Sequence, residues 1–414
     1  MTEPGRLPGL IHPHIKGDAA LSRPNLFSPL ELRGVTLKNR ILISPMWQYC
    51  AEFGHPTDHH VAHYGSLAAG GAGLVMQEGT TVEKRGRGTP GDLGIWDDEF
   101  VPGLARLVEL VKSKGATPGI QLMHPGRKVQ EHAPWKWADG NVPLTEEEKR
   151  GLDPEDWDRM APSPVPQMLY PDHPIAREMT LQDIRQVIDA FVQAAVRADE
   201  AGYEVVEIHA AHGYLIHLFL SEATNQRTDA YGGSFENRTR FLREIVEGVR
   251  AALPDEKPLL VRISCLDGSS WSMPDTIRLA KLLKELGVDM IDCSMGGIQK
   301  DIGADRRSAY AYQRSLAHEV KRDAGVRTNA VGLIVHAHHA NAIIENGHAD
   351  TVAIGRESIY NPYWPIDAAH KLGLDPGFES LPDRQGFWLK YREMGMQGFL
   401  PSTYANADIP PLEG

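Results

Sequence analysis

The most regular feature of this chain is a recurring order of polar and apolar positions, in which an amphipathic helical stretch ends at a glycine and a short Val- and Ile-rich run follows. Glycine suits the position after a helix because it adopts positive φ without a Cβ clash. The units begin at Gly71, Gly115, Gly202, Gly287, Gly325 and Gly347. Their repetition predicts that helices and strands alternate along the chain.

Two further apolar runs, residues 39–45 and 258–264, bring the number of predicted strands to eight. Strands that are apolar along their whole length are typical of a parallel sheet covered on both faces. Eight strand–helix units close naturally into a (β/α)8 barrel, and we predict this α/β TIM-barrel fold. The main alternative is an open doubly wound sheet, but no Gly-x-Gly-x-x-Gly turn follows the first strand at Ser44-Pro45.

The chain has 414 residues, more than the roughly 250 that such a barrel needs. We expect an N-terminal extension over residues 1–24, a barrel over 25–376 and a C-terminal tail over 377–414. The tail contains several large side chains and is expected to pack against another surface. The Pro- and Gly-rich start, up to residue 29, is expected to cover one end of the barrel. Insertions over 129–180 and 213–233 follow the third and fourth strands. They therefore belong at the carboxyl ends of the strands, where barrels keep their active sites.

Charge and cysteine content narrow the class of protein. Lys and Arg number 43 against 55 Asp and Glu, a net charge of −12 without a long basic run, so nucleic acid is not expected as a partner. The longest stretch without these charged residues, 59–77, is Gly-rich and contains three His, which does not fit a membrane span. The N-terminus does not resemble a secretion signal. Cys50, Cys265 and Cys293 form no Cys-x-x-Cys pair, so we expect a reduced, cytoplasmic protein without an iron–sulfur cluster.

The residues after the last two predicted strands suggest a site for an anion. Gly332 follows the seventh strand, and Gly355 and Arg356 follow the eighth, the positions at which many barrels bind phosphate. Two turn glycines with a surface arginine are the alternative interpretation. Arg262, within the fifth strand, needs an anion or a strong acceptor nearby, because an unpaired buried guanidinium is costly.

His209 and His212 lie where the fourth strand meets its loop, and three interpretations remain open for them. They could be metal ligands, although no third ligand is evident; they could be structural histidines; or they could donate hydrogen bonds to a ligand oxygen. Tyr214 lies two residues further on, and a phenol there can act as a general acid.

The segments His-Ala-Ala-His-Gly-Tyr-Leu-Ile-His (209–217) and 220–238 resemble the Old Yellow Enzyme family of FMN-dependent ene-reductases. Shorter matches follow in the family's order at residues 44–46, 60–64, 91–96, 119–122, 125–128, 261–264 and 354–357. The resemblance spans about residues 25–362 and is nearest to the thermophilic-like subclass that includes the xenobiotic reductases.

The resemblance implies an FMN site, with NADPH or NADH as the reductant. The isoalloxazine would be lined by Ser44, Pro45, Met46, Gly79, Gln121 and His209, with Arg262 at its N1/C2 edge and Gly332, Gly355 and Arg356 at the phosphate. His209 and His212 would bind the substrate oxygen, and Tyr214 would donate a proton. The implied reaction transfers hydride through flavin N5 to the activated C=C of an unsaturated carbonyl or nitro compound.

The chain departs from the subclass at Trp47, where cysteine is usual. The indole either borders the flavin and substrate or is a core tryptophan turned away from them, whereas Tyr49 keeps the family's aromatic position at the substrate. In the subclass a tail residue of a neighbouring subunit often reaches the active site, and Trp388 and Arg392 are the candidates here. A homodimer or homotetramer is therefore expected.

Other functions remain open at this stage. A flavoenzyme of the same fold could use another oxidant or substrate, as in hydroxylation or demethylation of aromatic acyl-CoA compounds, or could bind FMN without catalysis. A metal-dependent barrel hydrolase built on His209 and His212 is the alternative from a different class.

Overall fold

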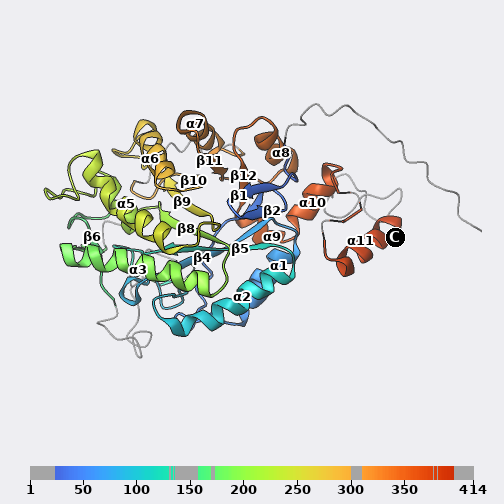
Figure 1. The fold of residues 1–414 in the computed structure, drawn as a ribbon, viewed down its shortest axis with the longest axis horizontal. Coiled ribbons are helices and arrows are strands. Elements are labelled where there is room, and N and C mark those ends of the chain that lie inside the picture. Colours follow the sequence, from blue (N-terminus) through green and yellow to red (C-terminus); the bar gives the residue numbers. More distant parts are fainter. Residues whose placement is uncertain are drawn as a thin grey trace, which may run out of the picture.

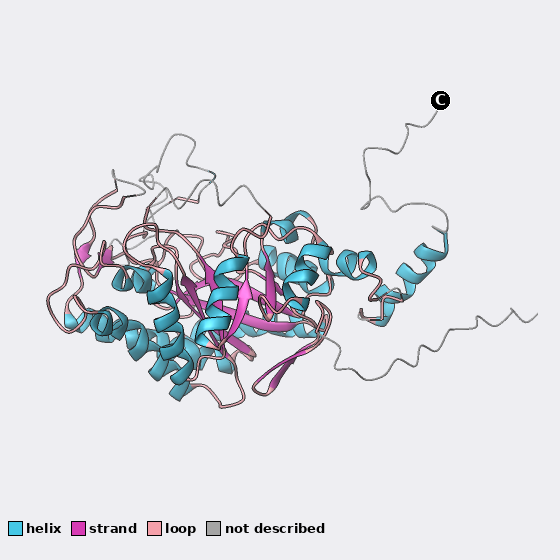
Figure 2. Cartoon of the chain, turned by 90° about the horizontal axis from the view of Figure 1, so that it is seen from above, coloured by secondary structure: helices cyan, strands magenta, loops and turns pink. Residues whose placement is uncertain are grey.

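A closed barrel of eight strands forms the centre of the protein (Figure 2). The structure, a computed structural model, describes residues 24–129, 132–133, 135, 157–168, 173–299, 310–375, 377–379 and 381–395. All neighbouring barrel strands are parallel. In chain order they are β3 (Ile41–Ile43), β4 (Leu74–Thr81), β5 (Thr117–Met123), β8 (Val205–Ala210), β9 (Leu259–Ser264), β10 (Met290–Ser294), β11 (Arg327–Ala330) and β12 (Thr351–Ile354). The predicted (β/α)8 barrel is confirmed, and the open sheet is excluded.

Helices follow the strands and surround the barrel (Figure 1). They are α1 (Asp58–Ala69), α2 (Val101–Ser113), α3 (Leu181–Glu200), α5 (Phe235–Ala252), α6 (Met273–Glu285), α7 (Arg314–Ala324) and α8 (Ala337–Glu345), with α9 (Arg356–Tyr360) and α10 (Trp364–Lys371) after β12. Two 3-10 turns, η1 (Lys84–Gly86) and η2 (Asp98–Phe100), lie between β4 and α2. The six glycines that define the repeat all have positive φ, between 62° and 94°. The sequence signal therefore has the backbone geometry expected of it.

A β-hairpin that the sequence analysis did not predict closes one end of the barrel. Its strands β1 (Leu30–Leu32) and β2 (Val35–Leu37) pair antiparallel. Leu32 and Leu37 pack in one buried cluster with residues at the starts of the barrel strands, including Leu74 and Leu260. The alternation of apolar and polar residues on both sides of Arg33-Gly34 was the signal that could have revealed it. The expected extension, residues 1–24, lies almost entirely outside the described residues.

Both predicted insertions begin at carboxyl ends of barrel strands. The described parts of residues 129–180 include the short parallel pair β6 (Met160–Ala161) and β7 (Arg177–Glu178). The insertion over 213–233 begins with α4 (Leu215–Leu220). Arg227 joins the two insertions by donating to the carbonyl oxygens of Pro162, at 3.1 Å, and Met179, at 2.6 Å. The loops above the barrel mouth are thus tied to one another.

The described part of the C-terminal tail forms α11 (Asp383–Gly395), which lies beyond α10 at one end of the molecule, away from the barrel (Figures 1 and 2). Among the helices of the described residues, none has both the length and the apolar character needed to cross a membrane.

Candidate functional site

Two adjoining cavities open at the carboxyl ends of the barrel strands, and Arg262 of β9 borders both of them. One has a volume of about 170 Å³ and is called here the histidine cavity; its lining is Pro45, Trp47, Gly79, Gln121, Met123, His209, His212, Tyr214 and Arg262. The other cavity has a volume of about 160 Å³ and is called the glycine cavity. Its lining includes Arg262, Gly332, Gly355, Arg356 and Glu357. Residues far apart in the sequence, which were predicted to form one site, therefore meet in one continuous cleft.

The two predicted histidines are joined in a short hydrogen-bonded chain. The Ala211 amide donates to Nδ1 of His209 at 3.1 Å, so the neutral ring carries its proton on Nε2. That nitrogen lies 3.1 Å from Nδ1 of His212, whose Nε2 in turn lies 2.7 Å from the hydroxyl of Ser294. This order assigns both tautomers: each ring presents an N–H from Nε2.

The backbone at His212 is held in an unusual conformation. Its φ is +58°, a left-handed value that costs energy for a residue with a Cβ. The turn lies directly against Gly297, where an added Cβ would approach within 2.0 Å of the His212 carbonyl carbon. The His212 amide also donates to the hydroxyl of Ser264 at 3.0 Å. The loop after β10 therefore fixes the direction in which His212 points.

Both histidines remain uncharged at neutral pH. Burial and the neighbouring Arg262 cation lower the pKa of His209 and that of His212 well below the usual value. Neutral imidazoles can donate one hydrogen bond each without repelling a cation. Within the described residues, no group of three or more His, Cys, Asp or Glu is arranged to hold a metal ion.

The Trp47 ring forms an aromatic wall of the histidine cavity, whereas Tyr49, which was predicted to contact substrate, packs against Trp47 but is not among the lining residues. Trp47 lies 5.4 Å from the Tyr214 ring and 5.4 Å from the Tyr49 ring, measured between centroids, and its Nε1 donates to the Gly79 carbonyl at 2.6 Å. Trp47 is therefore a wall of the cavity, and the alternative of a core tryptophan is wrong. The Tyr214 ring also packs edge-on against His209, with centroids 5.0 Å apart.

Lys128 is a residue of this site that the sequence analysis did not single out. Its Nζ donates to the His212 carbonyl at 2.7 Å and lies 4.9 Å from the centre of the Tyr214 ring. A cation at a ring face is held by the ring's quadrupole. Lys128 thus connects the loop after β5 to two of the three predicted catalytic residues, His212 and Tyr214, in the segment that follows β8.

The anion that Arg262 was expected to need nearby is Asp292 of β10. Arg262 Nε lies 3.3 Å from Oδ2 of Asp292 but makes no hydrogen bond with it or with any other described residue. Next to this pair, Gln121 donates from Nε2 to Glu207 at 2.6 Å. Burial and the charge of Asp292 raise the pKa of Glu207. Gln121 is thereby oriented with its amide nitrogen engaged, which leaves its oxygen free to meet a donor on a bound molecule.

The glycine cavity has an open backbone and an unused polar group. Gly332 has a φ of +106°, and an added Cβ would lie 3.0 Å from the side chain of Gln313. The buried Oε1 of Gln313 has no hydrogen-bond partner among the described residues. Ser44 and Met46 lie next to Gly355, although neither is among the residues that line the two cavities.

Trp388, also predicted to contact substrate, is far from this cleft in its own chain. It lies on α11, is 70% exposed and contacts Phe387 and Tyr391. The expectation that it reaches the site of a neighbouring subunit stays a prediction.

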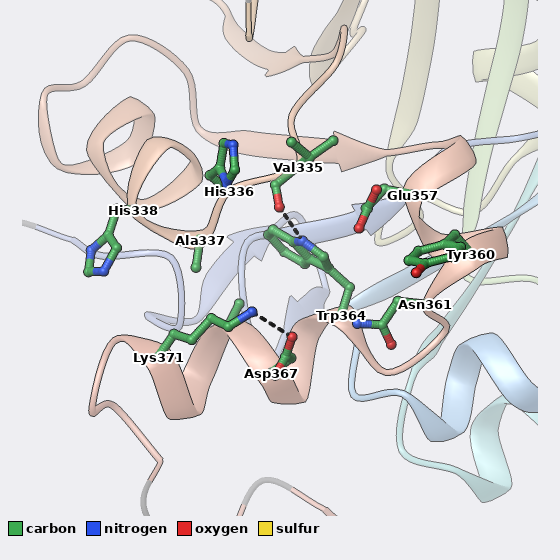
Figure 3. A pocket seen from close by; sticks show the side chains of 11 residues that line it. Val335, His336, Ala337, His338, Glu357, Tyr360, Asn361, Trp364, Asp367 and Lys371 are labelled. Carbon is green, nitrogen blue, oxygen red and sulfur yellow. Dashed lines mark hydrogen bonds and ion pairs between the residues drawn. The ribbon is translucent and has the colours of Figure 1, made fainter. Parts of the chain in front are cut away.

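A larger cavity, of about 640 Å³, lies among α8, α9 and α10 (Figure 3). It adjoins the glycine cavity, because Val335 and Glu357 line both. Trp364 Nε1 donates to the Val335 carbonyl at 2.8 Å, and Lys371 pairs with Asp367 at 2.8 Å (Figure 3). None of the residues predicted to act in catalysis lines this larger cavity.

Comparison with known proteins places this chain in a family. Residues 25–375 match the NADH:flavin oxidoreductase / NADH oxidase family. The chain is 44% identical over 352 residues to an NADPH dehydrogenase of Geobacillus sp. (strain WCH70), with 84% of this chain and 94% of that protein covered. It is 41% identical over 354 residues to an NADPH dehydrogenase of Bacillus subtilis (strain 168), covering 84% and 96%.

Solved structures of the same architecture agree with this assignment. Morphinone reductase superposes with a TM-score of 0.70 at 27% identity, over 86% of this chain and 91% of its own. The Old Yellow Enzyme homologue from Zymomonas mobilis gives 0.68 at 29% identity, over 84% and 93%.

The cleft also fits FMN on chemical grounds. It offers a buried guanidinium, Arg262, whose Nε has no hydrogen-bond partner among the described residues, and glycine backbone beside Arg356 at its end. The chain therefore belongs to the NADH:flavin oxidoreductase / NADH oxidase family, and it is an NAD(P)H-dependent FMN oxidoreductase of the Old Yellow Enzyme type.

Proposed function

We propose that this oxidoreductase is an ene-reductase, which reduces the activated C=C bond of α,β-unsaturated carbonyl or nitro compounds. The observation that carries the proposal is that two neutral imidazoles and one phenol, those of His209, His212 and Tyr214, line one cavity that Arg262 also borders. When bound, FMN supplies a two-electron carrier between the nicotinamide and the substrate.

The histidines hold the oxygen on which negative charge grows as hydride reaches the β-carbon. Their N–H groups now point to His212 Nδ1 and Ser294, so a substrate oxygen replaces these acceptors when it binds. Donors aimed at such an oxygen are each typically worth about 10² to 10³ in rate. Because the two rings are uncharged, they bind the oxygen without transferring a proton to it.

Tyr214 is the proposed proton donor to the α-carbon. It is the N-cap residue of α4, and its ring lies between those of Trp47 and His209. The position of Tyr214 in the lining of the histidine cavity supports this role. The Lys128 cation near the ring stabilises developing phenolate charge when the proton leaves.

The remaining predicted residues are proposed to hold FMN. Arg262 and Gln121 face the flavin ring, Gly79 allows its close approach, and Gly332, Gly355 and Arg356 bind the phosphate. An added Cβ at Gly79 would lie 2.2 Å from Met123 Sδ, so this position has no room for a side chain. Ser44, Pro45 and Met46 are proposed to contact the ring from the end of β3.

The visible spectrum of the purified protein under anaerobic conditions tests this function. NADPH or NADH should bleach the flavin absorbance, and cyclohexenone should restore it. Cyclohexanone is the matched control, since it has the same oxygen but no C=C bond and should leave the flavin reduced. A flavin that NADPH reduces but cyclohexenone fails to reoxidise would overturn the ene-reductase proposal and direct the search to another oxidant, such as an aromatic acyl-CoA.

We further propose that the protein is a homodimer or homotetramer joined through α11. This helix exposes four large apolar side chains, at Phe387, Trp388, Tyr391 and Met394, and an exposed cluster of this kind marks an interaction site. Light scattering should give a multiple of the 45.7 kDa chain mass and a smaller assembly for the Trp388→Glu/Tyr391→Glu variant. A wild-type monomer would contradict the proposal.

A further inference from the structure

Strand β4 contains an extra residue beside the proposed active site. Its register with β5 shifts between Gln77 and Gly79, which leaves Glu78 as the additional position. Bulges of this kind re-aim side chains next to active sites. The Glu78 side chain is completely buried and lies outside the cleft described above.

Both carboxyl oxygens of Glu78 have partners on other elements. Oε2 accepts the backbone N–H of Gln48 at 2.6 Å, in the loop after β3. Oε1 lies 3.1 Å from the hydroxyl of Tyr64 and 3.5 Å from Nε2 of His60, both on α1. The Tyr64 hydroxyl also accepts the Glu78 amide at 2.9 Å. The carboxyl group therefore joins the loop after β3 to a helix that packs on the barrel.

The same loop carries the aromatic wall of the histidine cavity. Its second attachment to β4 is the hydrogen bond from Trp47 Nε1 to the carbonyl of Gly79, the residue after Glu78. Tyr49, next to Gln48, has a φ of +54°, a strained value that persists only where surrounding contacts impose it. Two adjacent residues of β4, Glu78 and Gly79, thus hold two adjacent residues of the loop.

We propose that Glu78 is a positioning residue that holds the loop 45–50, and with it the Trp47–Tyr49 wall, in place through the Gln48 amide. What this wall selects rests on the proposed function, but the hold on the loop does not. Loss of the Glu78 contact removes one of the contacts that hold the strained backbone at Tyr49 and lets the indole move into or out of the cavity.

The pH dependence of this hold follows from the groups that face Glu78. They are His60 and Tyr64 on α1, Cys50 in the loop, Asp92 after β4, and Tyr203 before β8. Burial lowers the pKa of His60 to about 4, raises that of Cys50 to about 11, and raises those of both tyrosines above their usual range. The pKa of Asp92 is raised by burial to about 6. Between pH 6.5 and 9, Glu78 is therefore the group of this set that changes charge.

When the loop closes, the Glu78 carboxyl group takes up a proton. Burial raises the pKa of Glu78 from 4.5 to about 8, and this effect outweighs the opposite one of the hydrogen bond from the Gln48 amide. Opening of the loop admits water to the carboxyl group and therefore moves its pKa back toward the ordinary value. The loop is held most strongly at pH values below the ordinary pKa of the carboxyl group. As pH rises, the equilibrium shifts toward the open loop by up to about tenfold per pH unit, and it levels off above the raised pKa. Opening should accordingly increase from pH 6.5 to 8 and change little from 8 to 9.

Amide hydrogen exchange of the FMN-bound protein, read by mass spectrometry on a peptide covering residues 45–51 and corrected for the intrinsic pH dependence, tests the proposal without turnover. The wild type should show this rise and plateau. Glu78→Gln keeps an acceptor for the Gln48 amide and should remove the pH dependence while retaining protection at pH 6.5. Glu204→Gln, the same change at a half-exposed residue that pairs with Lys112, should behave as wild type. A Glu78→Gln variant that keeps the wild-type pH dependence would overturn the proposal.

A second variant separates positioning from a general loss of structure. Glu78→Leu removes the acceptor and should raise exchange of the 45–51 peptide tenfold or more at every pH, with other peptides unchanged; wild-type protection in this folded variant would contradict the inference. If Glu78→Leu does not fold, the pH profile of Glu78→Gln decides alone. Because exchange is measured without an alkene, failure of cyclohexenone to reoxidise the flavin would leave this result standing.

Discussion

The two walls of the histidine cavity are built on opposite principles. The β8 wall, with His209, His212 and Tyr214, presents groups that can donate protons or hydrogen bonds. It is braced by Ser264 of β9, Ser294 of β10 and Gly297 in the loop after β10. The β3 wall, with Trp47 and Tyr49, presents ring faces, and the one N–H of its indole is already bound to the Gly79 carbonyl.

From this difference we expect the β8 wall to act in catalysis and the β3 wall to select substrates by their shape. A bound substrate can exchange hydrogen bonds with the β8 wall, because both histidines line the cavity and their N–H groups are engaged only with His212 Nδ1 and the Ser294 hydroxyl. The β3 wall has no such exchange to offer through Trp47, so it acts through volume and apolar contact. Substitutions on the β8 wall should therefore lower rates, and those on the β3 wall should change which substrates fit.

The largest effect is expected for Tyr214→Phe. Loss of a positioned general acid should slow reoxidation of the reduced flavin by cyclohexenone by about 10² to 10⁴-fold, while reduction by NADPH stays nearly unchanged. Stopped-flow absorbance measures both half-reactions. Tyr49→Phe, the same change on the β3 wall, is the control and should affect neither strongly. An equal loss of both half-reactions in Tyr214→Phe would remove its role as proton donor.

A smaller loss is expected at His212, and two substitutions there separate donor from backbone. His212→Leu should lower the alkene half-reaction by about 10² to 10³-fold. His212→Asn keeps an N–H donor and tolerates the left-handed backbone, so it should retain most of the rate. If both variants lost activity equally, the histidine would matter for structure rather than for the oxygen.

Trp47→Phe should have a moderate effect, on KM rather than kcat. It removes the hydrogen bond to Gly79, worth about 0.5 to 1.5 kcal/mol, and enlarges the cavity. Bulky enones should gain relative to cyclohexenone, and steady-state kinetics with a series of ring-substituted enones would measure this. A fall in kcat that is the same for every enone would contradict the assignment of shape to this wall.

The smallest effect concerns pH. Because burial and Arg262 lower the pKa of both histidines well below the usual value, each stays neutral as pH falls from 8 to 6, and protonation begins only in more acidic solution. The half-reaction rate at saturating alkene should therefore be flat over this range. A rate that halves near pH 6.5 would mean that an ordinary histidine titrates in the site.

Much of the barrel was predictable because its signals are local. A glycine after a helix and an apolar run after the glycine depend only on neighbouring residues, and all six such glycines adopt positive φ. The hairpin β1–β2 was missed because three-residue strands give little periodicity, although its leucines are buried. Strand order then followed from the alternation, since parallel neighbours require helical crossovers.

The candidate site was predictable residue by residue but not in its contacts. His209, His212 and Tyr214 belong to one short segment, so their proximity was evident in the sequence. Asp292 as the partner of Arg262 was not evident, because the two residues lie on different strands and meet only when β9 pairs with β10. Lys128 escaped notice for the same reason.

The sequence by itself determined the alternation of strands and helices, the eight units, and the residues that stand at the strand ends, since each depends on local backbone preference and on burial of an apolar face. Only the tertiary structure decided that Trp47 faces the cavity and that Glu78 contacts the loop to which Trp47 belongs. Both depend on where β4 bulges and which side chains the closed barrel brings within hydrogen-bonding distance. Such distances arise from packing between distant segments, which no local pattern encodes.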